Sequence, residues 1–390
     1  MTASGEPVTT ATLIHSARTP SAADSAWVLL ADGIVSGSGV GRPPEVEGAS
    51  VVDAAGRLLV PGLVDLHCHG GAGRSFDDGP ESIAEAVALH RRHGTTRTMV
   101  SLVSATIDDL QRRLRAAAAA CEADPLLLGI HLEGPFLDPA HRGAHDPDVL
   151  TLPTAAIVDE LLEAAGGHLR AVTLAPELPG ADQAIERFVR HGVRVAVGHT
   201  GADYAEAARA FGEGASLLTH AFNGMAGLHH RDPGPVGAAL MDRSVTLELI
   251  ADGVHVHDAV IRTLFAGAPG RVALITDAMA GAGIPDGTFQ LGSMLVHVAD
   301  GVARTESGSL AGSTLTLDAA VRHVVAAGIE PREAIAAATV VPARALGLGD
   351  RFGRLEPGYA ADAVLLDDAL QVDTVWAAGE IVAGGTAAGR

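Results

Sequence analysis

The chain has 390 residues, 47% of them hydrophobic and 19% charged, which is enough for a large core and predicts one large domain plus a smaller one. The formal net charge of −20 argues against a general binder of nucleic acids or anionic membranes, whereas an anionic substrate would need local cations. All 27 basic residues are arginines, which excludes Schiff-base chemistry on lysine, a P-loop and a carbamylated lysine that bridges metals.

Both ends of the chain carry short β-like segments separated by turn signals. Near the N-terminus they cover residues 11–14, 26–30 and 33–36, and near the C-terminus residues 363–366, 372–377 and 380–382. We therefore predict that residues 1–57 and 353–390 together build a small β-sandwich domain, with the rest of the chain inserted between them.

The middle of the chain, residues 58–352, alternates between strand-like and helix-like patterns. The strand-like runs are residues 58–67, 95–103, 126–132, 169–174, 193–197, 216–220, 245–250 and 272–276. Helical patterns between them include residues 81–92, 107–120, 155–164, 183–191 and 204–211. This order predicts an α/β fold, a TIM-like (β/α)8 barrel that forms the catalytic domain. A doubly wound open sheet is the alternative, but no G-x-G-x-x-G motif follows the first strand.

Two histidines stand at the end of the first of these strands. Side chains alternate between the faces of a strand, so His67 and His69 point to one side and Cys68 to the other. Two imidazoles that converge at a strand end are a natural pair of metal ligands. A lone H-x-H pair also occurs by chance, so this pair needs support from the rest of the chain.

Other strand ends supply that support. Glu133, His199, His220 and Asp277 each lie where an apolar run gives way to a polar loop. The carboxyl ends of barrel strands share one face, so these side chains are expected around one pocket. Imidazole and carboxylate suit zinc or iron, and Asp277 could take a proton from a water that the metal activates. For His131, a packing role is at least as well supported as a place in the pocket, and His229 and His230 are ambiguous loop residues. Eight further histidines are interpreted as core or surface residues: His15, His90, His93, His168, His191, His257, His297 and His323.

The cysteine count and the chain's first residues bear on its compartment. Cys68 and Cys121 imply no disulfide framework, and the first residues lack a signal-peptide pattern. No apolar run approaches the ~20 residues needed to span a bilayer. We therefore expect a cytoplasmic protein with no membrane or nucleic-acid partner.

These motifs resemble the amidohydrolase superfamily, and within it the N-acetylglucosamine-6-phosphate deacetylase family. The similar segments are residues 67–70, 131–136, 197–200, 219–225, 250–255, 276–278 and 310–313. The resemblance implies that Glu133, His199 and His220 hold one divalent ion, and that His67 and His69, with Glu133 as a bridge, hold a second. One or two ions per subunit are expected, with zinc first and iron, manganese, cobalt or cadmium as alternatives.

The resemblance also implies roles around the substrate. Asp277 would be the general base and then the acid, and His145 would polarise the carbonyl of the N-acetyl group. The implied substrate contacts are Ala144, His145, Asn223, Gly224, Arg231, His255, Leu310 and Ala311. Arg231 would reach the phosphate in the neighbouring subunit of a homodimer; the alternative is a solvated loop arginine beside Asp232.

The implied reaction is hydrolysis of N-acetylglucosamine 6-phosphate to glucosamine 6-phosphate and acetate, in amino-sugar catabolism or cell-wall recycling. Two alternatives stay open. The same site could deacetylate N-acetylgalactosamine 6-phosphate or another N-acyl substrate. A non-catalytic barrel that binds sugar phosphates as a scaffold or sensor is the more remote alternative, because such proteins usually lose metal ligands.

Overall fold

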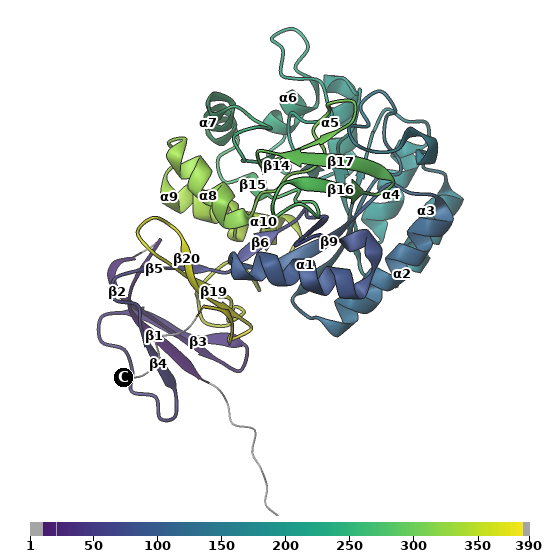
Figure 1. Ribbon diagram of the computed structural model, residues 1–390. Coiled ribbons are helices and arrows are strands. Elements are labelled where there is room, and N and C mark those ends of the chain that lie inside the picture. Colours follow the sequence, from purple (N-terminus) through teal and green to yellow (C-terminus); the bar gives the residue numbers. More distant parts are fainter. Residues whose placement is uncertain (1–10, 21, 385–390) are drawn as a thin grey trace, which may run out of the picture.

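Two sheets organise the molecule, and Figure 1 shows them side by side in the computed structural model, which describes residues 11–20 and 22–384. The larger one is a parallel eight-stranded sheet with the order β15-β14-β13-β12-β11-β10-β9-β6. Its strands are β6 (Leu63–Asp65), β9 (Thr95–Val103), β10 (Leu127–Glu133), β11 (Leu169–Leu174), β12 (Arg194–Val197), β13 (Leu217–Leu218), β14 (Thr246–Ile250) and β15 (Val272–Ile275). The predicted α/β fold and TIM-like barrel are confirmed.

The barrel closes between its first and last strands through the segments that follow them. Cys68 and Ala278 form a parallel bridge, and the backbone N–H of Asp277 donates to the carbonyl of His67 at 2.8 Å. The side chain of Asp65, fully buried, also accepts from the hydroxyl of Thr276 at 2.6 Å. Closure therefore joins the residues that carry the predicted metal and proton-transfer chemistry.

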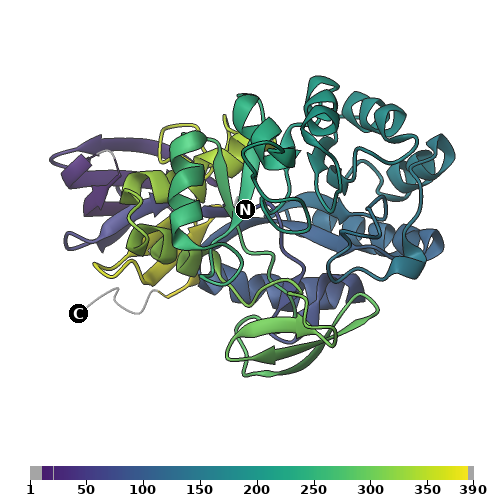
Figure 2. The ribbon, with the colours of Figure 1, turned by 90° about the horizontal axis from the view of Figure 1, so that it is seen from above.

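Helices follow the barrel strands and surround the sheet (Figure 2). They are α1 (Pro80–Arg92), α2 (Ile107–Ala123), α3 (Ala155–Ala164), α4 (Ala181–Arg190), α5 (Tyr204–Gly212), α6 (Gly234–Met241), α7 (Asp258–Gly267), α8 (Leu317–Ala326), α9 (Pro331–Ala337) and α10 (Val340–Ala345). Their starts are well marked in the sequence: Thr106 caps α2, and Asp203 with Glu206 forms a capping box at α5.

Strands from both ends of the chain form a second, mixed sheet with the order β21-β20-β19-β5-β1-β2-β3, and β4 pairs with β1. These strands are β1 (Thr12–Thr19), β2 (Ala22–Ala31), β3 (Ile34–Val40), β4 (Ser50–Asp53), β5 (Leu58–Pro61), β19 (Ala363–Leu366), β20 (Val372–Ala377) and β21 (Glu380–Ala383). Arg18 of β1 pairs with Leu58 of β5, which joins β1–β4 to the strands β5 and β19–β21. Ile14, Leu59 and Trp376 belong to the apolar cluster that both groups of strands share. The predicted domain limits stay a prediction, and residues 1–10 and 385–390 lie outside the described residues.

One predicted strand is wrong in its extent. The apolar run 58–67 is divided into β5, which pairs with β1 and β19, and β6, which pairs with β9 in the barrel. Gly62 alone separates the two strands, and a Cβ on it would lie 2.1 Å from the hydroxyl oxygen of Thr96. The chain therefore crosses from one sheet to the other at a position where only glycine fits.

A third, antiparallel sheet lies beside the mouth of the barrel and was not predicted. It contains β16 (Gly287–Leu291), β17 (Met294–Ala299) and β18 (Val302–Thr305). Its buried side chains, among them Leu291 and Val296, pack with Val103 and Met279 of the barrel. Shorter elements near the same face are β7 (Gly70–Gly71), β8 (Arg74–Ser75) and the 3₁₀ turns η1 (Phe76–Asp78) and η2 (Pro147–Val149).

Candidate metal centre and active site

The side chains that the sequence places at strand ends meet at one end of the barrel. His67 and His69 follow β6, and Glu133 is the last residue of β10; the others stand two residues beyond β12, β13 and β15, and are His199, His220 and Asp277. All six are buried, with at most 8% of any residue exposed. The carboxyl ends of parallel strands bring them together, as the barrel topology requires.

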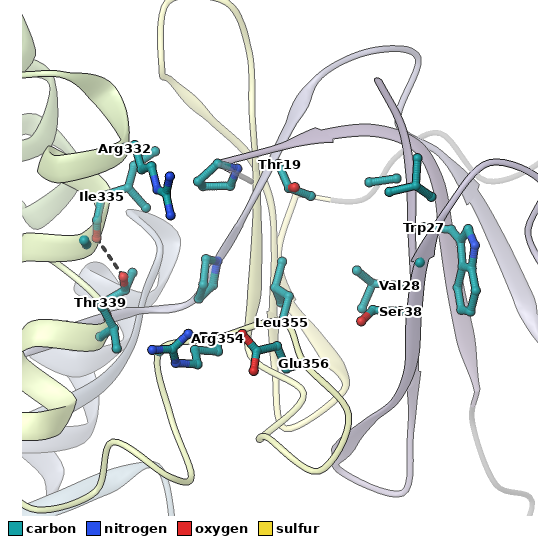
Figure 3. A pocket seen from close by; sticks show the side chains of 18 residues that line it. Thr19, Trp27, Val28, Ser38, Arg332, Ile335, Thr339, Arg354, Leu355 and Glu356 are labelled. Carbon is teal, nitrogen blue, oxygen red and sulfur yellow. Dashed lines mark hydrogen bonds and ion pairs between the residues drawn. The ribbon is translucent and has the colours of Figure 1, made fainter. Parts of the chain in front are cut away.

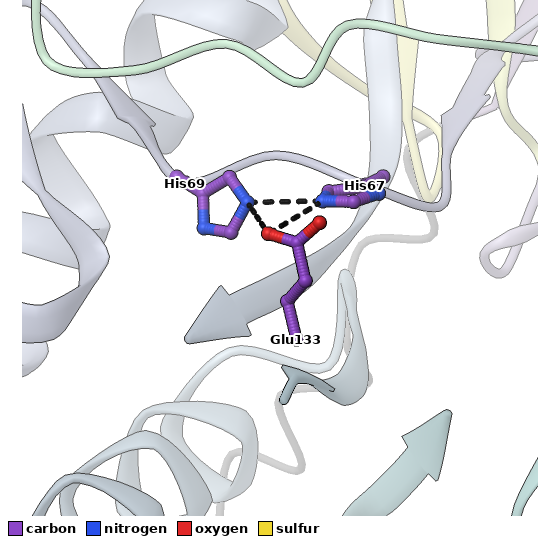
Figure 4. Close-up of side chains that lie close together, drawn as sticks. All are labelled: His67, His69 and Glu133. Atoms are coloured by element: carbon purple, nitrogen blue, oxygen red, sulfur yellow. Dashed lines mark hydrogen bonds and ion pairs between the residues drawn. The ribbon is translucent and has the colours of Figure 1, made fainter. Parts of the chain in front are cut away.

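The first cluster consists of His67, His69 and Glu133 (Figure 4). The Nε2 atoms of the two histidines lie 2.9 Å apart. The Oε2 atom of Glu133 lies 3.1 Å from Nε2 of His69 and 3.5 Å from Nε2 of His67. All three potential ligand atoms therefore face a single point.

The second cluster uses the other oxygen of the same carboxylate. Oε1 of Glu133 lies 3.0 Å from Nε2 of His199 and 3.1 Å from Nε2 of His220, and these two nitrogens are 3.0 Å apart. His145, expected to contact substrate, lies 3.4 Å from Oε2 and forms a further potential metal-holding group with Glu133 and His199. Glu133 thus stands between two groups of imidazoles with one oxygen toward each.

These donor sets fit divalent metal ions. Tetrahedral ligands about 2 Å from zinc lie roughly 3.3 Å from one another, close to the separations in both clusters. The local field also favours a cation: burial alone would lower the pKa of His67, but the nearby carboxylates of Glu133 and Asp277 raise it well above its usual value. The two buried histidine–glutamate clusters are therefore consistent with a binuclear metal site.

The backbone at three of these positions is unusual. His199, His220 and Asp277 have φ angles of 47°, 25° and 47°, in the left-handed region that side chains other than glycine rarely adopt. Each lies where the chain turns away from a strand end, so the turn aims its side chain back over the barrel. Backbone strain of this kind gathers at functional sites.

A cavity of about 240 Å³ opens above the clusters. The predicted site residues that line it are His69, Glu133, Ala144, His145, His199, His220, Asn223, Gly224, His255, Asp277 and Leu310. His67 and Ala311 are fully buried and do not line it. Glycine at position 224 lets the ring of His199 lie close to the backbone, because a Cβ there would lie 2.9 Å from Nδ1 of His199.

Arg231 lies apart from this cavity. The loop 226–232 is exposed along its whole length, and the Arg231 guanidinium meets Nε2 of His230 at 2.8 Å. The structure of one chain therefore does not bring Arg231 to its own cavity, and the predicted reach into a neighbouring subunit stays a prediction.

Two predicted substrate contacts are held by neighbours within their own loops. Nδ1 of His255 lies 2.7 Å from Oδ2 of Asp252, which orients the ring in the cavity wall. Burial acts to raise the pKa of Asp252, but the hydrogen bonds from His255 and from the backbone of Val254, together with the charge of His255, outweigh it and lower that pKa. The amide nitrogen of Asn223 donates to the carbonyl of His220 at 3.2 Å, so its side-chain oxygen is left for another donor.

The cavity wall also contains residues to which no role was assigned from the sequence. These are Gly143, Ile250, Leu291 and Ser309. Ile250 ends β14, and its place among the strand ends was a usable signal. Leu291 belongs to the unpredicted third sheet, so its contribution could not be seen without that sheet.

A wider cavity of about 390 Å³ lies between the terminal sheet and α9 (Figure 3). Trp27, Arg332, Arg354 and Glu356 are among its lining residues. The histidine–glutamate clusters do not reach it, so the hydrolytic chemistry is assigned to the smaller cavity.

The sequence model of the amidohydrolase family matches residues 58–382. The chain belongs to this family. An N-acetylgalactosamine-6-phosphate deacetylase of Escherichia coli O157:H7 is 42% identical, over 85% of this chain and 89% of its own length. An N-acetylglucosamine-6-phosphate deacetylase of Vibrio furnissii is 36% identical, over 83% of this chain and 82% of its own length.

Solved structures agree with these sequence relatives. An N-acetylglucosamine-6-phosphate deacetylase of Mycobacterium smegmatis, a variant in complex with N-acetylglucosamine 6-phosphate, superposes with a TM-score of 0.90 at 40% identity. The match covers 96% of this chain and 99% of that one. The chain is thus a metal-dependent amidohydrolase of the N-acetylhexosamine-6-phosphate deacetylase family. No helix among residues 11–20 and 22–384 is long and apolar enough to cross a membrane.

Proposed function

We propose that this chain hydrolyses the N-acetyl group of N-acetylglucosamine 6-phosphate, releasing glucosamine 6-phosphate and acetate. The observation that carries the proposal is the convergence of the two clusters on Glu133, with Asp277 beside them in a cavity. The structural relative from Mycobacterium smegmatis, which binds this sugar phosphate, supports the choice of substrate.

We assign the proton transfers to Asp277. Its Oδ1 lies 3.4 Å from Nε2 of His69 and 3.6 Å from Nε2 of His67, next to the proposed metal position. A divalent ion held there would lower the pKa of a water toward ~7 and polarise a carbonyl. Asp277 would take the proton of the attacking water and pass it to the amide nitrogen, so that the C–N bond breaks and the sugar leaves as an amine.

We assign the carbonyl oxygen of the substrate to His145. His145 is 7% exposed in the cavity wall, and burial lowers the pKa of its imidazole, so the ring is neutral near pH 7. A neutral imidazole can still donate one N–H hydrogen bond to the negative charge that develops on this oxygen. The cavity would thus offer one acid–base group and one oxyanion donor.

N-acetylgalactosamine 6-phosphate is the second candidate substrate, because the Escherichia coli relative, at 42% identity, is named for it. The two sugars differ in the orientation of one hydroxyl, so the choice depends on a single contact in the cavity. Comparison of kcat/KM for acetate release from both phosphates decides between them. A clear preference for the glucosamine derivative supports the proposal, a preference for the galactosamine derivative replaces it with the second candidate, and no acetate from either overturns both.

A further inference from the structure

Glu248 occupies an unusual place in the barrel. It lies on β14 between Leu247 and Leu249, so its side chain points to the inner face, as does that of Ile250, which lines the cavity. Inner positions of such barrels are mostly filled by Val, Ile and Leu. Glu248 is nevertheless 3% exposed. A carboxylate buried to this degree needs a partner that compensates for its charge.

That partner is His67. Oε2 of Glu248 lies 3.4 Å from Nδ1 of His67, at the long end of hydrogen-bond distances and within the range of an ion pair. The ring of His67 is completely buried. An ionised carboxylate can only accept, so this contact keeps a proton on Nδ1 and turns Nε2 toward His69 and Glu133, where it would face a metal ion.

The four clustered histidines differ in how their outer nitrogens are held. Nδ1 of His199 faces the carbonyl oxygen of His141 at 2.9 Å, a neutral partner. Nδ1 of His69 and of His220 has no hydrogen-bond partner in the described part of the chain. Within this group, a carboxylate therefore holds only the outer nitrogen of His67, although this ring is fully buried.

We propose that Glu248 is a positioning residue for the metal position of His67 and His69. It fixes the ring orientation and the tautomer of His67, and its negative charge strengthens Nε2 as a ligand. Substitution of a residue that hydrogen-bonds to a metal ligand in this way typically weakens metal affinity by ~10–100-fold. The inference rests on the proposed two-ion site and predicts that occupancy of the second position depends on Glu248.

Cobalt titration of the metal-depleted full-length protein tests this inference without reference to turnover. The absorption spectrum follows binding as Co²⁺ is added to the wild type and to Glu248→Gln, which keeps the shape of the side chain but removes its charge. We expect two equivalents to bind to the wild type. In the variant, the second should bind roughly 10–100-fold more weakly, while the affinity of the first is unchanged.

Two further variants separate positioning from general damage. Asp318→Asn, a matched control at another carboxylate that is 4% exposed, should leave both cobalt affinities unchanged. In a His67→Asn background, the additional change Glu248→Gln should not change cobalt affinity further, because the imidazole that Glu248 positions is absent. This comparison remains informative even if Glu248→Gln lowers the melting temperature.

The outcomes distinguish failure of the inference from failure of the proposed site. If Glu248→Gln binds both cobalt equivalents as tightly as the wild type does, the role of Glu248 is overturned and the two-ion site stays in place. A parallel loss of both equivalents in the variant would also overturn it, because that result indicates a general structural effect. Failure of the wild type to bind cobalt would refute the two-ion site together with the inference.

Discussion

At the residue scale, Glu133 is the group on which the site depends. One of its oxygens faces His199 and His220, and the other faces His67 and His69. Burial would raise the pKa of this carboxylate, but the surrounding imidazoles, His67 foremost, lower it well below its usual value. The carboxylate is therefore ionised near pH 7 and can serve both clusters at once.

Replacement of Asp277 by asparagine tests the acid–base assignment. The variant keeps the shape of the side chain but cannot accept the proton of the attacking water. We expect kcat to fall by roughly 10²–10⁴-fold or more, the scale of general acid–base catalysis, with metal content unchanged. Steady-state acetate release and elemental analysis measure the two quantities. Turnover close to that of the wild type would remove Asp277 from the mechanism.

Asp318, on α8, makes a pH-dependent contribution to stability. Burial acts to raise its pKa, but hydrogen bonds from His93, Thr316 and Arg322 outweigh it and lower the pKa to about 2. The unfolded chain, with a pKa near 3.9, binds the proton more readily. The resulting stabilisation of roughly 2 kcal/mol is therefore present above about pH 4 and is lost as the pH falls toward 2.

Denaturant unfolding between pH 6 and 2 checks this contribution. The difference in unfolding free energy between the wild type and Asp318→Asn should shrink by roughly 2 kcal/mol over this range. Asp350→Asn, at an exposed position, provides the control and should show a difference near zero at each pH. A difference for Asp318→Asn that is independent of pH would contradict the account.

At the scale of elements, the alternation of strand-like and helix-like segments predicted the barrel, because most of its strands are short, largely apolar runs that are buried on both faces. The cluster residues could be found for the same reason, since each marks the point where such a run ends. The sequence pattern alone could not show that the first run, residues 58–67, divides into two strands at Gly62. The division arises because Gly62 must pass close to Thr96, a contact between segments 34 residues apart in sequence.

The third sheet was missed although the chain carries a signal for it. Asp300-Gly301 is a typical hairpin turn, and both residues have positive φ angles, 51° and 74°. The flanking strands β17 and β18 alternate between buried and exposed residues. What the sequence could not show is the position of this sheet, because that depends on packing against Val103 and Met279.

A buried ion pair joins the barrel to the terminal sheet. Arg97, on β9, contacts Asp362, which directly precedes β19, at 2.6 Å, and both side chains are at most 7% exposed. Asp362 also accepts from the backbone N–H of Ala378 at 2.8 Å. Because loss of one partner leaves the other charge buried, Arg97→Met should reduce the unfolding free energy by ~3–5 kcal/mol.

Urea denaturation measures this loss, with Arg18→Met as a matched control. Arg18 also contacts a carboxylate, Asp368, but the two side chains are 41% and 92% exposed. Exposed pairs contribute at most ~1 kcal/mol, so the control should change little. Equal effects of the two substitutions would show that the Arg97 pair does not hold the two sheets together.

At the scale of the whole molecule, the resemblance predicts a homodimer in which each active site would depend on Arg231 of the other subunit. Asp277→Asn and Arg231→Ala would each impair the enzyme, at least at low substrate concentration. After subunit exchange in an equal mixture, half of the dimers would be mixed, and each would contain one complete site. Activity should then recover to about a quarter of the wild-type value.

Arg243 provides the control for the subunit-mixing experiment. Arg243→Ala, at another exposed arginine, should keep full activity alone and should not raise KM for the phosphorylated substrate. If Arg231 serves its own subunit, no mixed dimer has a complete site. Activity that stays at the average of the two separate variants would therefore contradict the shared site.

We expect the clusters around Glu133 to hold metal ions that the deacetylation requires. Acetate release from N-acetylglucosamine 6-phosphate, before and after metal removal and again after metal is restored, tests it most directly. The account predicts that the metal-depleted protein releases no acetate and that one or two equivalents of a divalent ion per chain restore the activity. Undiminished acetate release by protein shown to be metal-free would contradict it.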